Sequence, residues 1–166
     1  MKKQQSGFTL VELIVVIVIL GILSATALPR FIGVATDARI ATLEGLAGAM
    51  RSAVMMTVSK QTLDGKDSSN VFMQDGTKVI VYTRSAEGAA SAGVPIASTS
   101  GIVAALRDAE SSGFRFTASG TNLEARLKRD STTTDCRIIY QGYDSTNASA
   151  TGKVDTSYLT PENCGG

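Results

Sequence analysis

The chain divides into an apolar N-terminal run and a mixed remainder. Residues 8–29 are nearly all apolar, and no side chain between Glu12 and Arg30 is charged. A run of this length predicts a helix that can cross a bilayer, which needs about 20 residues. Lys2 and Lys3 precede the run. The positive-inside rule therefore predicts a cytoplasmic N-terminus and an exported C-terminal domain.

A second helical pattern follows the apolar run. Past Pro29, apolar residues recur every three or four positions and form one stripe: Ile40, Leu43, Ala47, Met50, Val54 and Val58. Charged residues are expected on the opposite face: Asp37, Arg39, Glu44, Arg51 and Lys60. We expect one long helix kinked at Pro29, because proline removes a backbone hydrogen bond and crowds the preceding turn. Gly21 is a second weak point, since glycine costs about 1 kcal/mol relative to alanine in a helix.

The C-terminal half alternates apolar and polar residues in short runs, as half-buried strands do. Strands are predicted around an Asp75-Gly76 turn, around a turn at 119–122 and further towards the C-terminus, with these apolar members: Val71 and Met73; Val79 and Val81; Phe114, Phe116 and Ala118; Leu123, Ala125 and Leu127; Cys136, Ile138 and Tyr140; Val154 to Leu159. The alternation predicts an antiparallel meander.

One helix is predicted between these strands. Ser98 is expected to cap a helix over residues 101–111, with Gly113 just past its end. Residues 142–152 are expected to form a loop. The long N-terminal helix should bury its apolar stripe against the sheet, which makes the fold class α+β.

Composition argues against several kinds of function. The net charge is +1, without the basic excess typical of nucleic-acid binding. The chain has no histidine, which excludes Ser-His-Asp and Cys-His catalysis and the commonest zinc ligand. Asp64, Asp67 and Asn70 lack the spacing of a calcium loop and are interpreted as solvated. We expect no catalytic residue, no metal and no cofactor.

The two cysteines, Cys136 and Cys164, both lie in the polar half. An even cysteine count in an exported domain favours a disulfide. It would close a loop of about 29 residues, which the chain-entropy model values at roughly 3–4 kcal/mol. The alternative is two free thiols in a cytoplasmic protein.

Glu12 is the one acid inside the apolar run. A carboxylate in a membrane-spanning segment costs roughly 2.5–3.5 kcal/mol on insertion scales, so it normally has a partner. An ordinary secretory signal, cut near Ser24–Ala27, would explain the run alone. It fits less well, because the leader is very short and the acid lies where such a signal is uncharged.

These features together resemble the type IV pilin and pseudopilin family. The resemblance is carried by Lys2-Lys3, by Gly7-Phe8-Thr9-Leu10-Val11-Glu12 and by the apolar stretch that follows. Within the family, Pro29-Arg30-Phe31, Asp37-Ala38-Arg39 and the segment 101–106 are most similar to mannose-sensitive haemagglutinin (MSHA) pilins.

The resemblance implies a processing and assembly route. A prepilin peptidase would cut after Gly7 and methylate the new amine of Phe8. Glu12 would then pair with the Phe8 amine of a neighbouring copy; pairing within its own chain, or a protonated acid, remain alternatives. Gly21 and Pro29 match positions where family filaments lose helical order. The Cys136–Cys164 loop matches a region often exposed on the filament.

Four segments follow from this resemblance: a cleaved basic leader (1–7), a membrane-spanning and filament-core helix (8–30), an amphipathic stalk (31–62) and a β-rich domain (63–166) containing the 136–164 loop. The implied partners are other copies of the chain, the prepilin peptidase, the inner-membrane assembly machinery and, before assembly, membrane lipid. The surface ligand is left open.

The resemblance implies a structural subunit rather than an enzyme. The protein would reside in the inner membrane and then in an extracellular pilus of a Gram-negative cell, serving adhesion, motility or DNA uptake. The alternative is a type II secretion pseudopilin in a periplasmic pseudopilus, which often carries a calcium loop and lacks this disulfide. A more distant alternative is a membrane-anchored periplasmic enzyme or binding module.

Overall fold

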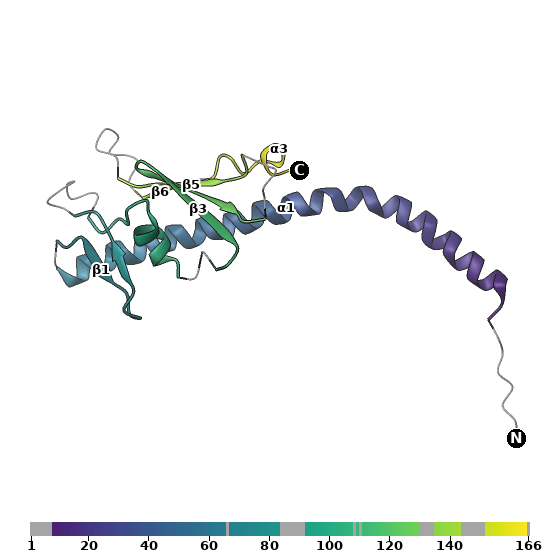
Figure 1. The fold of residues 1–166 in the computed structure, drawn as a ribbon, viewed down its shortest axis with the longest axis horizontal. Coiled ribbons are helices and arrows are strands. Elements are labelled where there is room, and N and C mark those ends of the chain that lie inside the picture. Colours follow the sequence, from purple (N-terminus) through teal and green to yellow (C-terminus); the bar gives the residue numbers. More distant parts are fainter. Residues whose placement is uncertain are drawn as a thin grey trace, which may run out of the picture.

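A single long helix organises the molecule. The computed structural model describes residues 8–65, 67–83, 92–107, 109, 111–129, 135–143 and 152–165. Helix α1 (Leu10–Asp64) has 55 residues and a length of roughly 80 Å. Its N-terminal half stands alone, and its C-terminal half lies against the strands (Figure 1). The predicted fold class, a long apolar helix with small antiparallel sheets in an α+β arrangement, is confirmed.

Both ends of α1 have sequence-encoded caps. Thr9 is the N-cap, with extended backbone at φ −82° and ψ 146°. Gly65 ends the helix in the left-handed region at φ 62°, where glycine is favoured, and its N–H donates to the Thr62 carbonyl. The helix stays continuous through Gly21 and Pro29. It bends gradually along its N-terminal half (Figure 1), and the sharp kink expected at Pro29 is not seen.

The strands form two antiparallel sheets. Strands β1 (Asn70–Phe72) and β2 (Lys78–Ile80) make a hairpin. Strands β3 (Phe114–Ser119), β4 (Asn122–Leu127), β5 (Ile138–Gln141) and β6 (Lys153–Asp155) form a meander in chain order. The predicted meander and the predicted turn at 119–122 are confirmed. The last strand is shorter than predicted, because the Asp155 carboxylate accepts from the Ser157 N–H and begins a turn. Most of the loop expected over 142–152 lies outside the described residues.

The helix predicted over residues 101–111 is wrong in extent. A short helical turn, η1 (Thr99–Val103), forms there, and Ser98 caps it as predicted by accepting from the Gly101 N–H. Gly101 leaves helical geometry, and a Cβ at this position would collide with the Ile96 carbonyl. Arg107 has φ 44°, which ends any further helix before the predicted boundary.

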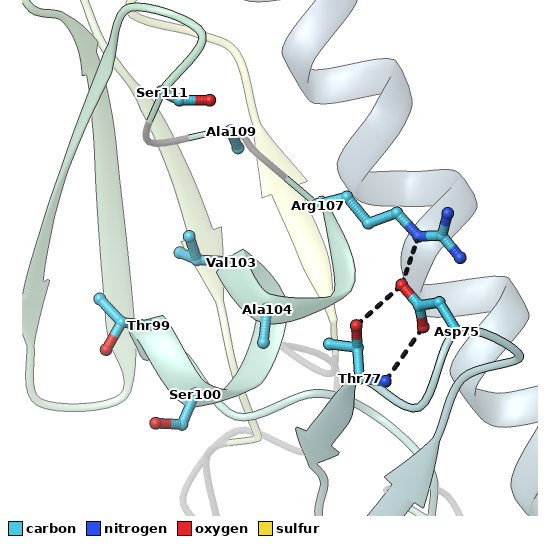
Figure 2. A pocket seen from close by; sticks show the side chains of 9 residues that line it. All are labelled: Asp75, Thr77, Thr99, Ser100, Val103, Ala104, Arg107, Ala109 and Ser111. Atoms are coloured by element: carbon cyan, nitrogen blue, oxygen red, sulfur yellow. Dashed lines mark hydrogen bonds and ion pairs between the residues drawn. The ribbon is translucent and has the colours of Figure 1, made fainter.

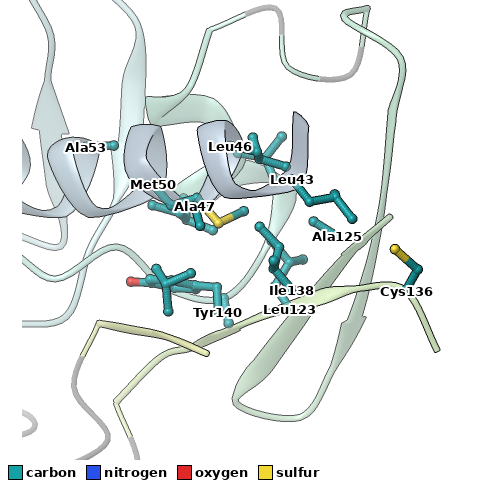
Figure 3. Packing of buried hydrophobic residues seen from close by; sticks show 14 of the residues in the cluster. Leu43, Leu46, Ala47, Met50, Ala53, Leu123, Ala125, Cys136, Ile138 and Tyr140 are labelled. Atoms are coloured by element: carbon teal, nitrogen blue, oxygen red, sulfur yellow. The ribbon is translucent and has the colours of Figure 1, made fainter. Parts of the chain in front are cut away.

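The core lies between α1 and the four-stranded sheet (Figure 3). Leu43, Ala47 and Met50 of the predicted stripe are buried, and Ile40 and Val54 are partly buried. Leu46 and Ala53, which the stripe did not include, are buried beside them. The other side of the core consists of inward residues of β4 and β5: Leu123, Ala125, Ile138 and Tyr140. The Tyr140 hydroxyl donates to the Pro95 carbonyl at 2.6 Å, so its polar end is satisfied inside the core. The expectation that the stripe buries against the sheet is confirmed. A short C-terminal helix, α3 (Pro161–Cys164), also contacts α1.

Candidate assembly site

The N-terminus of α1 holds Glu12 in a capping box. The Glu12 Oε2 atom accepts from the Thr9 N–H at 2.9 Å and from the Thr9 hydroxyl at 2.8 Å. In return the Thr9 hydroxyl oxygen accepts from the Glu12 N–H at 3.3 Å. This reciprocal arrangement satisfies backbone donors that the first helical turn leaves unpaired.

The capping box leaves part of the carboxylate available. Among the residues that the structure describes, Glu12 Oε1 accepts no hydrogen bond. Phe8 lies immediately before the cap, and its side chain is 81% exposed. A cation supplied from outside the chain therefore has access to Oε1 while Oε2 keeps its bonds to Thr9. In the uncleaved chain the Phe8 nitrogen belongs to a peptide bond and is not an amine. The partner that the structure shows for Glu12 is Thr9. The predicted leader, with Lys2, Lys3 and Gly7, lies outside the described residues.

The helix that follows is apolar on every side, and no other described part of the chain packs against it. Residues Leu10–Ala27 are long and apolar enough to cross a membrane, and 0% of this segment is buried. A helix with apolar residues all round is one that is buried in lipid or in protein. A Cβ added at Gly21 would meet nothing within 4 Å, so no contact within the chain requires a glycine there. The side chain of Pro29 lies outside the described residues.

The two cysteines form a disulfide at the start of the stalk. The sulfurs of Cys136 and Cys164 are bonded, and both residues are buried. Arg39 of α1 donates from Nη1 to the Cys164 carbonyl at 2.9 Å. The Arg137 guanidinium lies 4.1 Å from the centre of the Tyr158 ring. The C-terminal segment is thus held to both the sheet and the stalk.

One concavity in the described part of the chain lies beside a hydrogen-bonded, ion-paired acid. It has a volume of about 620 Å³ and lies between the β1–β2 hairpin and η1 (Figure 2). Bonds from the Thr77 N–H and hydroxyl hold the pKa of Asp75 below its ordinary value. The same carboxylate pairs with Arg107 Nε at 3.0 Å. Both oxygens of the Asp75 carboxylate are thus occupied by Thr77 and Arg107. The described residues contain no cluster of three or more metal-ligating side chains.

Sequence reasoning missed two residues that position these features. Thr9 is the hydrogen-bond partner of Glu12, and the signal was available in the Thr-x-x-Glu spacing of a capping box. Arg39 was expected to face solvent, yet it binds the Cys164 carbonyl. No local signal predicts that contact, because 125 positions separate the two residues.

Known proteins match part of the chain. Residues 2–28 match the prokaryotic N-terminal methylation motif. The chain is 37% identical over 73 residues to the type IV major fimbrial protein FimA of Dichelobacter nodosus, covering 44% of each chain. It is 53% identical over 47 residues to the type IV narrow pilus major component PilA5 of Thermus thermophilus, covering 28% of this chain and 40% of that one.

A secretion protein is also similar. The type II secretion system core protein G of Pseudomonas aeruginosa is 42% identical over 55 residues, covering 33% of this chain and 39% of that one. The chain thus spans less than half the length of these curated relatives. No solved structure matches the chain significantly.

The fold and the site define a class of protein: an α+β domain carried on a long helix whose exposed half is apolar and begins at a methylation motif. Within that class the chain is similar to major type IV fimbrial and pilus proteins and to a type II secretion core protein.

Proposed function

We propose that this chain is a pilin, a structural subunit that polymerises into a type IV pilus. The proposal rests on three features that occur together at the N-terminus. A methylation motif leads into an uncovered apolar helix, and that helix begins with an acid that keeps one oxygen available. An anchor alone requires the apolar helix but not the acid.

Processing supplies the partner that Glu12 lacks. Cleavage between Gly7 and Phe8 would place a charged amine at the new N-terminus, and methylation would keep that charge. In an apolar layer, a carboxylate and an ammonium each carry a desolvation penalty that their pairing offsets. A pair between copies also fixes the register of one helix against the next. We therefore assign cleavage to Gly7–Phe8, methylation to Phe8 and assembly pairing to Glu12.

The uncovered helix would have two successive environments. Before assembly the subunit would lie in the inner membrane with its N-terminus in the cytoplasm, and lipid would surround the helix. Neighbouring copies cover it in the filament outside the cell. Gly21 and Pro29 are proposed as points where the helix yields during this transfer, since both lower helix stability. The proposed segments are 1–7, 8–30, 31–62 and 63–166.

A type II secretion pseudopilus is the second candidate, and the similarity to core protein G favours it. The Cys136–Cys164 disulfide favours a pilin instead, because major pseudopilins are expected to lack it. Within the pilins, we propose the MSHA type on the resemblance of Pro29-Arg30-Phe31, Asp37-Ala38-Arg39 and residues 101–106.

Mass spectrometry of the protein purified from its own cells tests the processing step. We expect a mature chain that begins at N-methylated Phe8. A Gly7→Ala variant should remain at full length, because the peptidase would no longer recognise the cut site. An intact Met1 in the wild type, or a cut near Ala27, would rule out the proposed route.

A further inference from the structure

A second hollow lies between the C-terminal end of α1 and the β1–β2 hairpin. It has a volume of about 450 Å³, within the range of about 300–1,000 Å³ that is usual for small-molecule sites. Met56, Lys60 and Leu63 line it from one side of the helix, because their three- and four-residue spacing places them on a single stripe. Met73 of the hairpin and Arg107 line it from the domain. We call this space the distal hollow.

The walls of the distal hollow are mainly apolar. Met56 is 56% exposed and Leu63 is 84% exposed, while Met73 is half-buried. Methionine side chains are flexible and polarisable, so they adapt to the shape of an apolar group that lies against them. Exposed large apolar side chains that gather around a hollow are typical of a binding site.

Arg107 lies on the wall between the distal hollow and the concavity beside Asp75. Its guanidinium uses only Nε in the ion pair with Asp75 Oδ2, at 3.0 Å. The two Nη atoms lie beyond that pair, on the side away from Thr99 and Ser100 (Figure 2). Within the described part of the chain these two atoms donate no hydrogen bond. The edge that they form matches the two oxygens of a carboxylate.

The guanidinium is held in this position by its acid and by its backbone. The Thr77 N–H and hydroxyl donate to Asp75 at 3.0 Å and 2.8 Å, so the carboxylate that pairs with Arg107 is itself fixed. The backbone of Arg107 has φ 44°, a left-handed conformation that is uncommon for residues other than glycine, asparagine and aspartate. Residues held in such conformations cluster at ligand-binding sites. The fold therefore presents an oriented pair of donors to the hollow.

Lys60 supplies a second cation at the distal hollow. Its ammonium pairs with Asp64 Oδ1 at 2.8 Å, and its side chain is 40% exposed. An ammonium has three N–H donors, so this pair leaves two of them for another acceptor. Because Lys60 and Arg107 are each already paired with an acid, recognition depends on short-range hydrogen bonds rather than on net charge. Apolar walls beside such donors suit a ligand that has a carboxylate at one end and an apolar body.

We propose that the distal hollow is a binding site for a small carboxylic acid with an apolar body. The carboxylate lies on the Nη edge of Arg107, and the apolar body lies against Met56, Leu63 and Met73. A purely apolar ligand would leave the Arg107 donors unused, and a purely polar anion would leave the apolar walls in water. The apolar segment Leu10–Ala27 takes no part in the site, so binding does not depend on the proposed function.

Methionine methyl resonances test the site in the full chain, reconstituted in nanodiscs of zwitterionic lipid. Hexanoate is the probe, because it is soluble in water and carries a short apolar body. The methyl signals of Met56 and Met73 should shift saturably as hexanoate is added. Met55, which is 72% exposed but does not line the hollow, should not shift, and neither should the buried Met50. Acetate lacks the apolar body and hexanol lacks the carboxylate, so each should need an at least about tenfold higher concentration.

Two variants separate recognition by Arg107 from unspecific adsorption. Arg107→Gly removes the guanidinium at a backbone position that glycine favours, so the domain should stay folded, as an unchanged Met50 signal would show. Its affinity for hexanoate should fall about tenfold or more. Arg115→Gln removes an exposed arginine of β3 that does not line the hollow, and it should keep the wild-type affinity.

Three results would overturn the proposal. The first is the absence of saturable shifts in the wild type, or equal shifts at Met55 and Met56. The second is an equal effect of hexanol and hexanoate, which would show that the carboxylate is not recognised. The third is full affinity for hexanoate in Arg107→Gly. The comparison of hexanoate with hexanol uses the wild type alone, so it decides the matter even if Arg107→Gly fails to fold.

Discussion

The two halves of α1 belong to one helix but meet different surroundings. In the C-terminal half, every third or fourth residue is buried against the sheet, as at Leu43 and Met50. In the N-terminal half, Leu10–Ala27 has no buried residue. Burial of apolar area stabilises the first half within one chain, while the second must obtain the same stabilisation from lipid or from other copies. The helix therefore joins a folded domain to an apolar segment that the domain leaves uncovered.

The polar groups differ between the halves in the same way. In the domain, Tyr140 donates to the Pro95 carbonyl and Arg39 to the Cys164 carbonyl, so side-chain donors find acceptors within the chain. At the N-terminus, Glu12 uses one oxygen for its own cap and leaves the other without a donor among the described residues. A carboxylate that lies in an apolar segment and has only one oxygen hydrogen-bonded indicates a partner outside the chain.

Replacing Glu12 should give the largest effect, on assembly alone. Glu12→Val removes the carboxylate while keeping the helix apolar, so the domain should fold and the leader should be cleaved. Filament yield in the sheared fraction should fall by about 100-fold or more if a pair between copies drives addition. Thr9→Val, which removes the hydroxyl of the cap and keeps the acid, is the control and should assemble far better. Normal filaments from Glu12→Val would refute the pairing of Glu12 with the Phe8 amine of a neighbouring copy.

Removing the disulfide should give the largest effect on the domain. A Cys136→Ser/Cys164→Ser variant frees a loop closed across 28 positions, and the free energy of unfolding should fall by roughly 3–4 kcal/mol. Denaturant unfolding in detergent, followed by tyrosine near-UV circular dichroism, measures this change. The helical signal of Leu10–Ala27 should remain, because no contact with the domain supports that segment.

Two methionines of the stalk lie on different sides of the helix. Met50 is 0% exposed and Met56 is 56% exposed. Met50→Ala should lower the free energy of unfolding by roughly 2–5 kcal/mol, the usual cost of truncating a buried side chain. Met56→Ala should change it by less than about 0.5 kcal/mol, as at other exposed positions. Similar losses from both variants would contradict the placement of the stalk against the sheet.

The smallest effect should be a pH dependence confined to the domain. Hydrogen bonds from the Thr77 N–H and hydroxyl lower the pKa of Asp75 in the folded state. A lowered folded-state pKa gives stability that is present above the unfolded pKa and is lost as pH falls through the folded pKa. Unfolding of the wild type should therefore become easier as pH drops below about 4. Asp75→Asn should lack that part of the dependence, and an unchanged pH profile in this variant would show that Asp75 does not contribute.

Patterns that repeat locally made much of the fold predictable from the sequence. Three- and four-residue spacing identified the buried side of the stalk at Leu43 and Met50, and two-residue alternation identified β3 and β4. The helix predicted over 101–111 was wrong because its end is decided by tertiary structure. Arg107 takes a left-handed conformation and pairs with Asp75 of the distant hairpin. Local propensity contains no information about such a partner.

The candidate site was likewise predictable only where the signal was local. Glu12 stood out in the sequence because one acid in an apolar run is costly, and its capping partner follows from the Thr-x-x-Glu spacing. The contacts of Arg39 and Arg51 with the domain did not stand out, because both side chains were expected on the side of α1 opposite the core. Only their contacts with the Cys164 and Val154 carbonyls reveal that both side chains turn towards the domain.

The most direct test of the central claim is electron microscopy of material sheared from the cell surface, labelled with an antibody against the folded domain. The account predicts long filaments labelled along their whole length in the wild type, and none in a strain that lacks the chain. Label confined to the inner membrane, with no filament at the surface or in the periplasm, would contradict the claim that the uncovered half of α1 becomes the core of a polymer.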